Sequence, residues 1–265
     1  MNSGPKSGSR SKVFWIAITF AAALAWAFGF QTWAWHEARR MDKSDPCLAL
    51  IPRSLPDESS SRGAAIKQTY FGYEFEAPWP RPVAAKQAPF LVDLIFHGDY
   101  AVVFFNPAER RNLLDDTTAI ERHPNMKDAM AAMIGRDAAQ SNYDFFRNIF
   151  NITPAQVLPT LSKREANRRL TLLRMKGIDC GRKPSAFYFF QFQNLRCFQI
   201  GDPAVERSVE VRCFDPSDHE LSFLFGVREN SGLKMSQMEV NRVIQSLRPA
   251  QLPSSQPTGT NRSNN

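Results

Sequence analysis

The chain has 265 residues, of which 43% are hydrophobic, and it carries a formal net charge of +7. This apolar content excludes a wholly disordered chain. Four cysteines are too few for a disulfide-dense small scaffold. The length is sufficient for one large domain or two small ones.

The first feature along the chain is a segment without charged residues, from Val13 to Trp35. As a helix it would be about 34 Å long, and a hydrocarbon core is about 30 Å thick. Tryptophans gather toward its carboxyl end, as they do at headgroup boundaries. We therefore expect residues 13–35 to be a transmembrane signal anchor that contacts the lipid bilayer, after a basic amino-terminal tail over 1–12.

Two other interpretations of this segment stay open. A cleaved signal peptide would use Val13–Leu24 as its apolar stretch and Ala25-Trp26-Ala27 as its cleavage pattern, which would give a secreted domain. A buried core helix is the other, although uncharged segments this long are rare in soluble cores. The apolar run continues past Ala27, which favours retention as an anchor.

The orientation of the anchor is predicted from its flanks. Basic residues lie on both sides of it, so the positive-inside count is nearly balanced. A short basic tail before a long carboxyl-terminal domain most often leaves the tail inside. We therefore expect a single-pass membrane protein with an extracytoplasmic domain.

The rest of the chain divides by composition. Residues 36–65 are expected to form a juxtamembrane helix that ends before Pro46, followed by a flexible tether rich in proline and serine. Residues 66–248 are expected to form one domain. Residues 249–265 contain almost nothing to bury and are expected to be a disordered tail.

Within 66–248, short alternating or apolar runs predict strands. These runs are 70–78, 91–96, 100–105, 187–193, 196–200, 208–214 and 220–228. Helical spacing or capping boxes predict helices around Met126–Ile134 and Tyr143–Phe150, and after Thr153, Ser162 and Ser236. The order of strands, helices, strands and a final helix predicts an α+β fold: a mainly antiparallel sheet with helices packed on it, arranged as an α/β/α sandwich or in a related form.

Two short segments carry a resemblance to a known family. The opening strand Gly72-Tyr73-Glu74-Phe75-Glu76-Ala77-Pro78 and the closing helix Glu239–Leu247 resemble the ends of PsbP-like domains, which include photosystem II subunit P and Ran-binding relatives. The resemblance implies an α/β/α sandwich and a binding or assembly role. The residues between the two ends, above all 113–178, depart from the family pattern, so no functional residue is carried over.

The four cysteines have neither C-x-x-C spacing nor a Cys/His metal-ligand spacing, so no metal site is expected. Cys197 and Cys213 lie on successive predicted strands and would face each other across a hairpin. They could form a cross-strand disulfide or remain two buried thiols. Cys47 could pair with Cys180, cross-link two chains or stay free.

A local excess of basic residues is the main candidate for a binding surface. Residues 162–183 contain eight basic and two acidic side chains. Such a helix could hold an anionic surface, an acidic partner protein or phosphates, or it could simply be solvated. Aromatic residues for base stacking are not interleaved with it, so nucleic acid is not expected. The predicted surface consists of Lys163, Arg164, Arg168, Arg169, Arg174 and Lys176.

Aromatic residues are concentrated in one predicted hairpin. They could fill a core on both faces of the sheet, which we favour, or form an exposed patch at a ligand groove. The residues are Phe187, Tyr188, Phe189, Phe190, Phe192 and Phe198.

No sequence motif for catalysis is present. The four histidines do not have metal-ligand or catalytic spacing, and glycine-rich phosphate loops and nucleophile-elbow motifs are missing. We therefore predict a non-catalytic binding, scaffold or assembly role without a cofactor, whose partner is a membrane or envelope protein or an anionic surface. The alternative is an envelope-associated hydrolase with a site assembled from His97, His123 or His219 and a distant aspartate.

Overall fold

The computed structural model describes residues 8–56, 59–108, 141–157, 162–228 and 232–250, without the side chains of 8–17 and 20–27. The predicted helix around Met126–Ile134, His123 and residues 251–265 of the predicted tail lie outside these ranges. The description below refers to the remaining residues.

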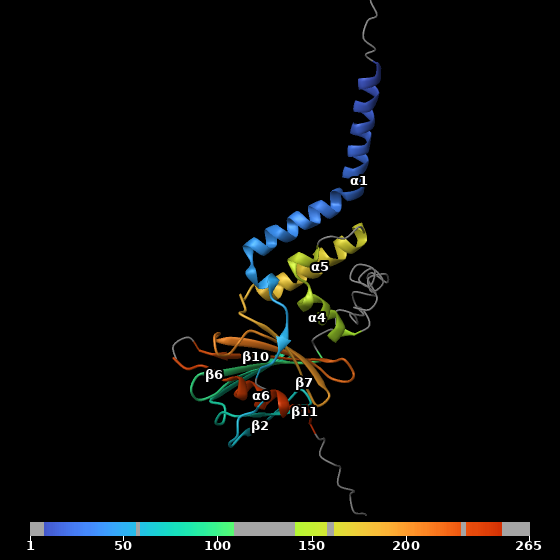
Figure 1. Cartoon of the computed structure of the whole chain (residues 1–265). Coiled ribbons are helices and arrows are strands. Elements are labelled where there is room, and N and C mark those ends of the chain that lie inside the picture. Colours follow the sequence, from blue (N-terminus) through green and yellow to red (C-terminus); the bar gives the residue numbers. More distant parts are fainter. Residues whose placement is uncertain (1–7, 57–58, 109–140, 158–161, 229–231, 251–265) are drawn as a thin grey trace, which may run out of the picture.

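An eight-stranded sheet forms the centre of the fold, in the order β1-β7-β8-β9-β10-β6-β5-β4 (Figure 1). All neighbouring strands are antiparallel except β1 and β7, which are parallel. The expected α+β class with a mainly antiparallel sheet is therefore confirmed. The strands are β1 (Arg53–Ser54), β4 (Ala84–Ala88), β5 (Leu91–Ile95), β6 (Tyr100–Phe105), β7 (Phe187–Phe192), β8 (Leu195–Ile200), β9 (Ser208–Phe214) and β10 (Glu220–Val227).

One face of this sheet packs against a smaller sheet and helix α6 (Gln237–Gln245). The smaller sheet has the order β11-β3-β2, with β2 (Ile66–Tyr70), β3 (Tyr73–Ala77) and β11 (Arg248–Pro249). Phe75 of β3 contacts Phe104 and Phe223 of the main sheet at ring-centroid distances of 5.8 and 5.4 Å. Interlocking aromatic rings thus hold the two sheets together.

Helix α6 begins as its sequence predicts. The hydroxyl of Ser236 accepts a hydrogen bond from the Glu239 backbone N–H, and the Glu239 carboxylate accepts one from the Ser236 backbone N–H. This capping box satisfies two amides at the start of the helix. The stripe of Val240, Val243 and Ile244 is fully buried against the sheets.

The helices other than α6 lie on the side of the opposite face of the main sheet (Figure 1). They are α1 (Gly8–Ser44), α4 (Asn142–Asn151) and α5 (Lys163–Cys180), with the short 3-10 helices η1 (Pro46–Ala49) and η3 (Pro154–Val157). Helix α4 lies next to the sheet, and α1 lies beyond α5. Phe150 of α4 contacts Phe187 and Phe198 of the sheet at 5.2 and 5.1 Å. A second aromatic core therefore lies between the sheet and α4.

Helix α5 begins directly after Ser162, as the capping box predicts, and it continues through Gly177 to Cys180. Its main packing neighbours are α1, α4, η1 and η3. Leu170 and Leu173 are buried in this layer of helices.

Helix α1 has two parts that run in different directions (Figure 1). Figure 1 shows that its first part points away from the domain and that, after a bend, its second part runs beside α5. Ala34 and Ala38, one turn apart, are completely buried in this second part. Their small side chains permit close approach of α1 and α5.

No helix in the described part of the chain meets the length and apolarity required to cross a membrane.

The prediction of a flexible tether is wrong for residues 44–55. Leu48 and Leu55 are buried, η1 packs against α5, and β1 pairs with β7 at the edge of the main sheet. The prolines and polar residues suggested a tether, but this segment lies on the domain because its few apolar side chains have partners there. Helix α1 does end at Ser44, next to the expected stop at Pro46.

Both cysteine pairs form disulfides. Cys47 of η1 is bonded to Cys180 at the end of α5, with the Cα atoms 5.7 Å apart. Cys197 and Cys213 are directly paired neighbours on β8 and β9 and are bonded across the strands, with the Cα atoms 4.1 Å apart. The first bond fixes the segment that follows α1 to the end of α5, and the second reinforces the centre of the sheet.

We predict that the two disulfides contribute unequally to stability. Cys47→Ala with Cys180→Ala should lower the free energy of unfolding by about 4–5 kcal/mol, because the closed loop is long. Cys197→Ala with Cys213→Ala should cost about 3 kcal/mol because its loop is short. Denaturant unfolding followed by near-ultraviolet circular dichroism measures both. A larger loss for the Cys197–Cys213 pair would contradict this account.

Candidate functional site

The structure separates the six basic residues that were predicted to form one surface. Arg168 and Arg169 are paired with Glu165, with N–O distances of 3.1 and 2.7 Å. Arg169 also donates a 2.6 Å hydrogen bond to the Gln156 carbonyl. These two guanidinium groups therefore have partners within the helical layer. Arg164 is exposed on the first turn of α5.

The other three predicted residues have different surroundings. Arg174 lies 3.8 Å from Glu37 of α1, and Lys163 is exposed. Lys176 is completely buried, so its place on a partner surface is corrected: it cannot touch a partner. Leu172, Lys176 and Cys180 follow one another at intervals of four residues on the inner side of α5, and this spacing was the available signal.

Three cation–ring pairs form an aromatic–basic collar along α1, and two of them join α1 to α5. Lys163 lies over the ring of Phe30 at 5.4 Å, Arg174 over Trp33 at 5.8 Å, and Arg39 over Trp35 at 4.5 Å. Cations at these distances are attracted by the ring faces. We use the name collar for these six residues: Phe30, Trp33, Trp35, Arg39, Lys163 and Arg174.

The collar has the chemistry of a membrane–water boundary. Trp33 is 48% exposed although it is a large apolar residue. Exposed indole rings beside long basic side chains suit the headgroup region, where rings and ammonium or guanidinium groups are both solvated favourably. The tryptophans were noted from the sequence, but the pairing of Trp33 with Arg174 of α5 depends on helix packing that no local pattern shows.

The buried side chain of Lys176 connects α5 to the segment after α1 and to the segment after α4. Its Nζ donates hydrogen bonds to the carbonyls of Leu48, Leu50 and Ile152, at 3.1 Å for Leu48 and 2.9 Å for Ile152. Three carbonyl acceptors match the three N–H donors of an ammonium group. Burial lowers the pKa of Lys176 to about 8. The residue therefore holds the segment after α1 in place.

A buried ionic cluster fixes the carboxyl end of α5 to the sheet. Arg212 of β9 donates to Asp179 and to Glu210, both at 2.6 Å, and its guanidinium lies over Phe146. Arg182 adds a 2.9 Å hydrogen bond to Glu210. Burial raises the pKa of Asp179. Since each carboxylate is paired with a guanidinium group, the cluster has a structural role.

The histidines proposed for the hydrolase alternative are not assembled into a site within the described residues. His97 is exposed in the turn between β5 and β6. His219 lies 3.2 Å from Asp215, but its side chain is 59% exposed. Asp215 also accepts hydrogen bonds from the backbone amides of Ser217 and His219, so it shapes this turn.

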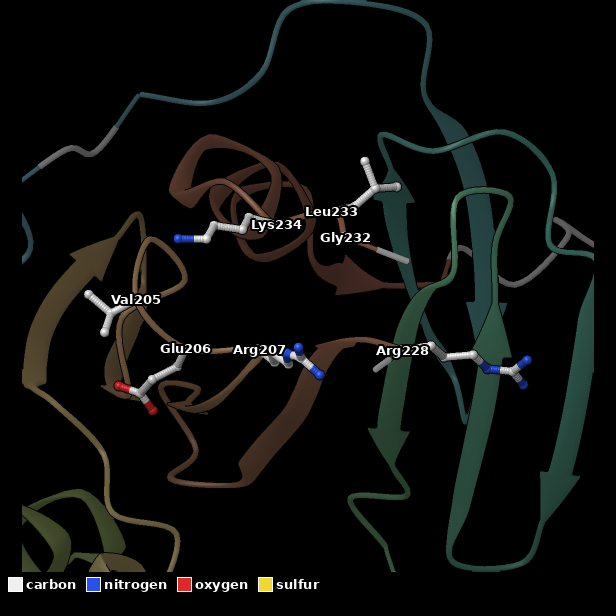
Figure 2. Close-up of a pocket in the computed structure, with 7 residues that line it drawn as sticks. All are labelled: Val205, Glu206, Arg207, Arg228, Gly232, Leu233 and Lys234. Carbon is white, nitrogen blue, oxygen red and sulfur yellow. The ribbon is translucent and has the colours of Figure 1, made fainter. Parts of the chain in front are cut away.

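A cavity of about 150 Å³ among surface loops is lined by three basic residues (Figure 2). Lys234 donates to the Ala204 carbonyl, and Glu206 accepts hydrogen bonds from Ser185 and Asp202. Figure 2 shows that the charged ends of Lys234 and Arg228 point in opposite directions. The basic groups do not converge, so this cavity is not built to hold an anion.

We predict that Lys176→Met destabilises the protein by about 3 kcal/mol, because it leaves three carbonyls without a donor. Lys86→Met, at an exposed position on β4, is the matched control and should change stability by less than about 0.5 kcal/mol. Thermal and denaturant unfolding measure both. Equal losses of stability in Lys176→Met and Lys86→Met would contradict the structural role of Lys176.

The difference in stability between the wild type and Lys176→Met, measured as a function of pH, tests the protonation of the buried Lys176 amine. Its folded pKa of about 8 is below the ordinary value of 10.5. Between these values the unfolded chain binds more protons, so the stability of the wild type relative to Lys176→Met should rise with pH in this window and be flat below it. A fall in this window would show that the folded state favours the charged form more strongly than the unfolded state does.

No protein-family profile matches this chain, and no significant match was found among curated proteins or solved structures. The PsbP-like resemblance of the two ends of the domain therefore stays a prediction.

Proposed function

We propose that the chain is a single-pass membrane protein whose α+β domain is mounted directly on its anchor helix and has a non-catalytic binding or scaffold role. The observation that carries this proposal is that α1 ends in the packing of the domain, where Ala34 and Ala38 are buried. The uncharged segment 13–35 of the same helix, which includes Ala34, has the length of a bilayer span. A domain held in this way has a fixed orientation at the membrane surface.

The compartment is inferred from the cysteines. All four are paired in two disulfides. Disulfides persist in oxidising compartments and are rare where thiols are kept reduced. This pairing supports an extracytoplasmic domain with the amino terminus inside.

The collar is proposed to contact the headgroups. It lies at the carboxyl end of the uncharged segment, and it combines exposed Trp33 with Lys163 and Arg39. Basic side chains near an anionic bilayer surface gain about 1 kcal/mol each. The collar would thus orient the domain on anionic lipid.

Binding is preferred to catalysis for two reasons. The buried charged groups Lys176, Arg212 and Asp179 are occupied in structural bonds. A binding role is also what the PsbP-like resemblance implies. No observation in the described part of the chain favours the hydrolase alternative.

We predict the topology from this proposal. A cysteine introduced at the exposed Ala85 should react with a membrane-impermeant thiol reagent on intact cells, and one introduced at Ser3 should react only after lysis. Full-length protein should also stay in the membrane pellet at alkaline pH. Labelling of the Ala85 position only after lysis would place the domain inside the cell and contradict the proposal.

We predict that the collar responds to lipid charge. In nanodiscs, replacing part of a zwitterionic lipid by phosphatidylglycerol should stabilise the wild type by about 2 kcal/mol more than a Lys163→Gln/Arg174→Gln variant. A Lys86→Gln/Arg207→Gln variant loses the same charge at exposed positions remote from the collar and should behave like the wild type. The thermal unfolding midpoint is the readout. The same response in all three proteins would exclude headgroup contact by the collar.

A further inference from the structure

Phe189 is exposed on the face of the main sheet that packs against the helices, unlike its aromatic neighbours there. Its neighbours on this face, Phe187, Phe198 and Phe214, are at most 2% exposed, whereas Phe189 is 44% exposed. The helices cover the first three rings and leave the fourth open. An aromatic ring exposed beside a cavity is a common wall of a ligand site.

A cavity of about 330 Å³ lies at Phe189, between the edge of the sheet and α4. Tyr143 and Phe198 form a second aromatic wall, stacked with centroids 5.0 Å apart and planes inclined by 22°. The lining consists of Pro52, Tyr143, Arg147, Asn151, Phe189 and Phe198. The size is at the lower end of the range for small-molecule sites.

The polar groups of the cavity come from one face of α4. Arg147 and Asn151 are one helical turn apart, and both side chains are exposed. Among the described residues, no carboxylate is paired with Arg147. The nearby Arg196 lies over Tyr143 at 4.1 Å and is 3.7 Å from Asp218, so its charge is balanced. Arg147 thus leaves the cavity with a positive charge that a ligand could neutralise.

We propose that this cavity binds a planar aromatic carboxylate, with its ring stacked on the exposed face of Phe189 and its carboxylate on the Arg147 guanidinium. Tyr143, whose ring faces are covered by Phe198 and Arg196, bounds the ligand with its edge. An exposed aromatic face favours a flat ring through stacking. The planar fork of arginine matches both oxygens of a carboxylate, and the Asn151 amide offers another donor. This inference is independent of membrane anchoring, because the cavity is built from α4, β7, β8 and the residue before β1.

Isothermal titration calorimetry tests it with full-length protein in zwitterionic nanodiscs and 1-naphthoate as the probe. A titration into empty nanodiscs gives the blank. The wild type should bind saturably, and Arg147→Gln and Phe189→Ala should each weaken binding by at least about tenfold. Both positions are exposed, so circular dichroism should show folded variants.

Two matched variants control for loss of charge and loss of a ring elsewhere. Arg207→Gln removes an exposed arginine outside this cavity, and Phe90→Ala removes a ring that is 59% exposed at the turn between β4 and β5. Both should bind 1-naphthoate within about twofold of the wild type. The uncharged analogue 1-naphthalenemethanol should bind at least about tenfold more weakly.

Three outcomes would overturn the proposal. They are no saturable binding to the wild type, equal weakening by the control variants, or equal affinity for the uncharged analogue. None of these results depends on the topology of the chain, so they are separate from a failure of the proposed function.

Discussion

One buried ammonium group holds the junction between helix α1 and the rest of the domain. Lys176 Nζ donates to carbonyls on both sides of the junction: Leu48 and Leu50 after α1, and Ile152 after α4. The Cys47–Cys180 disulfide closes the same junction four residues further along α5. Burying a lysine is costly unless every donor has an acceptor, so the arrangement is stable only when all three segments meet.

The function that we propose depends on this junction. With a flexible tether, the domain would sample many orientations, and a surface such as the collar would meet the membrane by chance. With the packing of Ala34 and Ala38 on α5, the collar and the sheet are fixed relative to the helix. In this proposal, the direction of α1 therefore determines the orientation of the whole domain.

The sequence was sufficient for the elements whose signals are local. Strands 100–105 and 208–214 were predicted with their observed bounds, the first from a continuous apolar run and the second from an alternating pattern. The Ser236–Glu239 capping box correctly placed the start of α6. The pairing of Cys197 with Cys213 could be foreseen as one of two alternatives because hairpin geometry is local as well. The small sheet was missed, since β2 and β11 have short, mixed patterns.

The junction could not be predicted because it depends on contacts between distant residues. Pro46 and Pro52 suggested a tether. The pairing of Cys47 with Cys180 was only one of three alternatives, because no local pattern selects a partner at a separation of 133 residues. Lys176 was grouped with the basic surface because charge is counted along the sequence, whereas burial is decided by α1, η1 and α4 together. The cavity at Phe189 was foreseen only as the less favoured interpretation of the aromatic hairpin, because its opening depends on where α4 ends.

The most direct test of this account is a pulsed electron-spin distance measurement on full-length protein in nanodiscs. Spin labels at the exposed positions Arg40 of α1 and Gln191 of β7 report the orientation of the domain relative to the helix. A rigid junction predicts one narrow distance distribution, which broadens when Cys47→Ala, Cys180→Ala and Lys176→Met are combined. A broad distribution in the otherwise unaltered protein would show that the domain moves freely on a tether and would contradict the central claim.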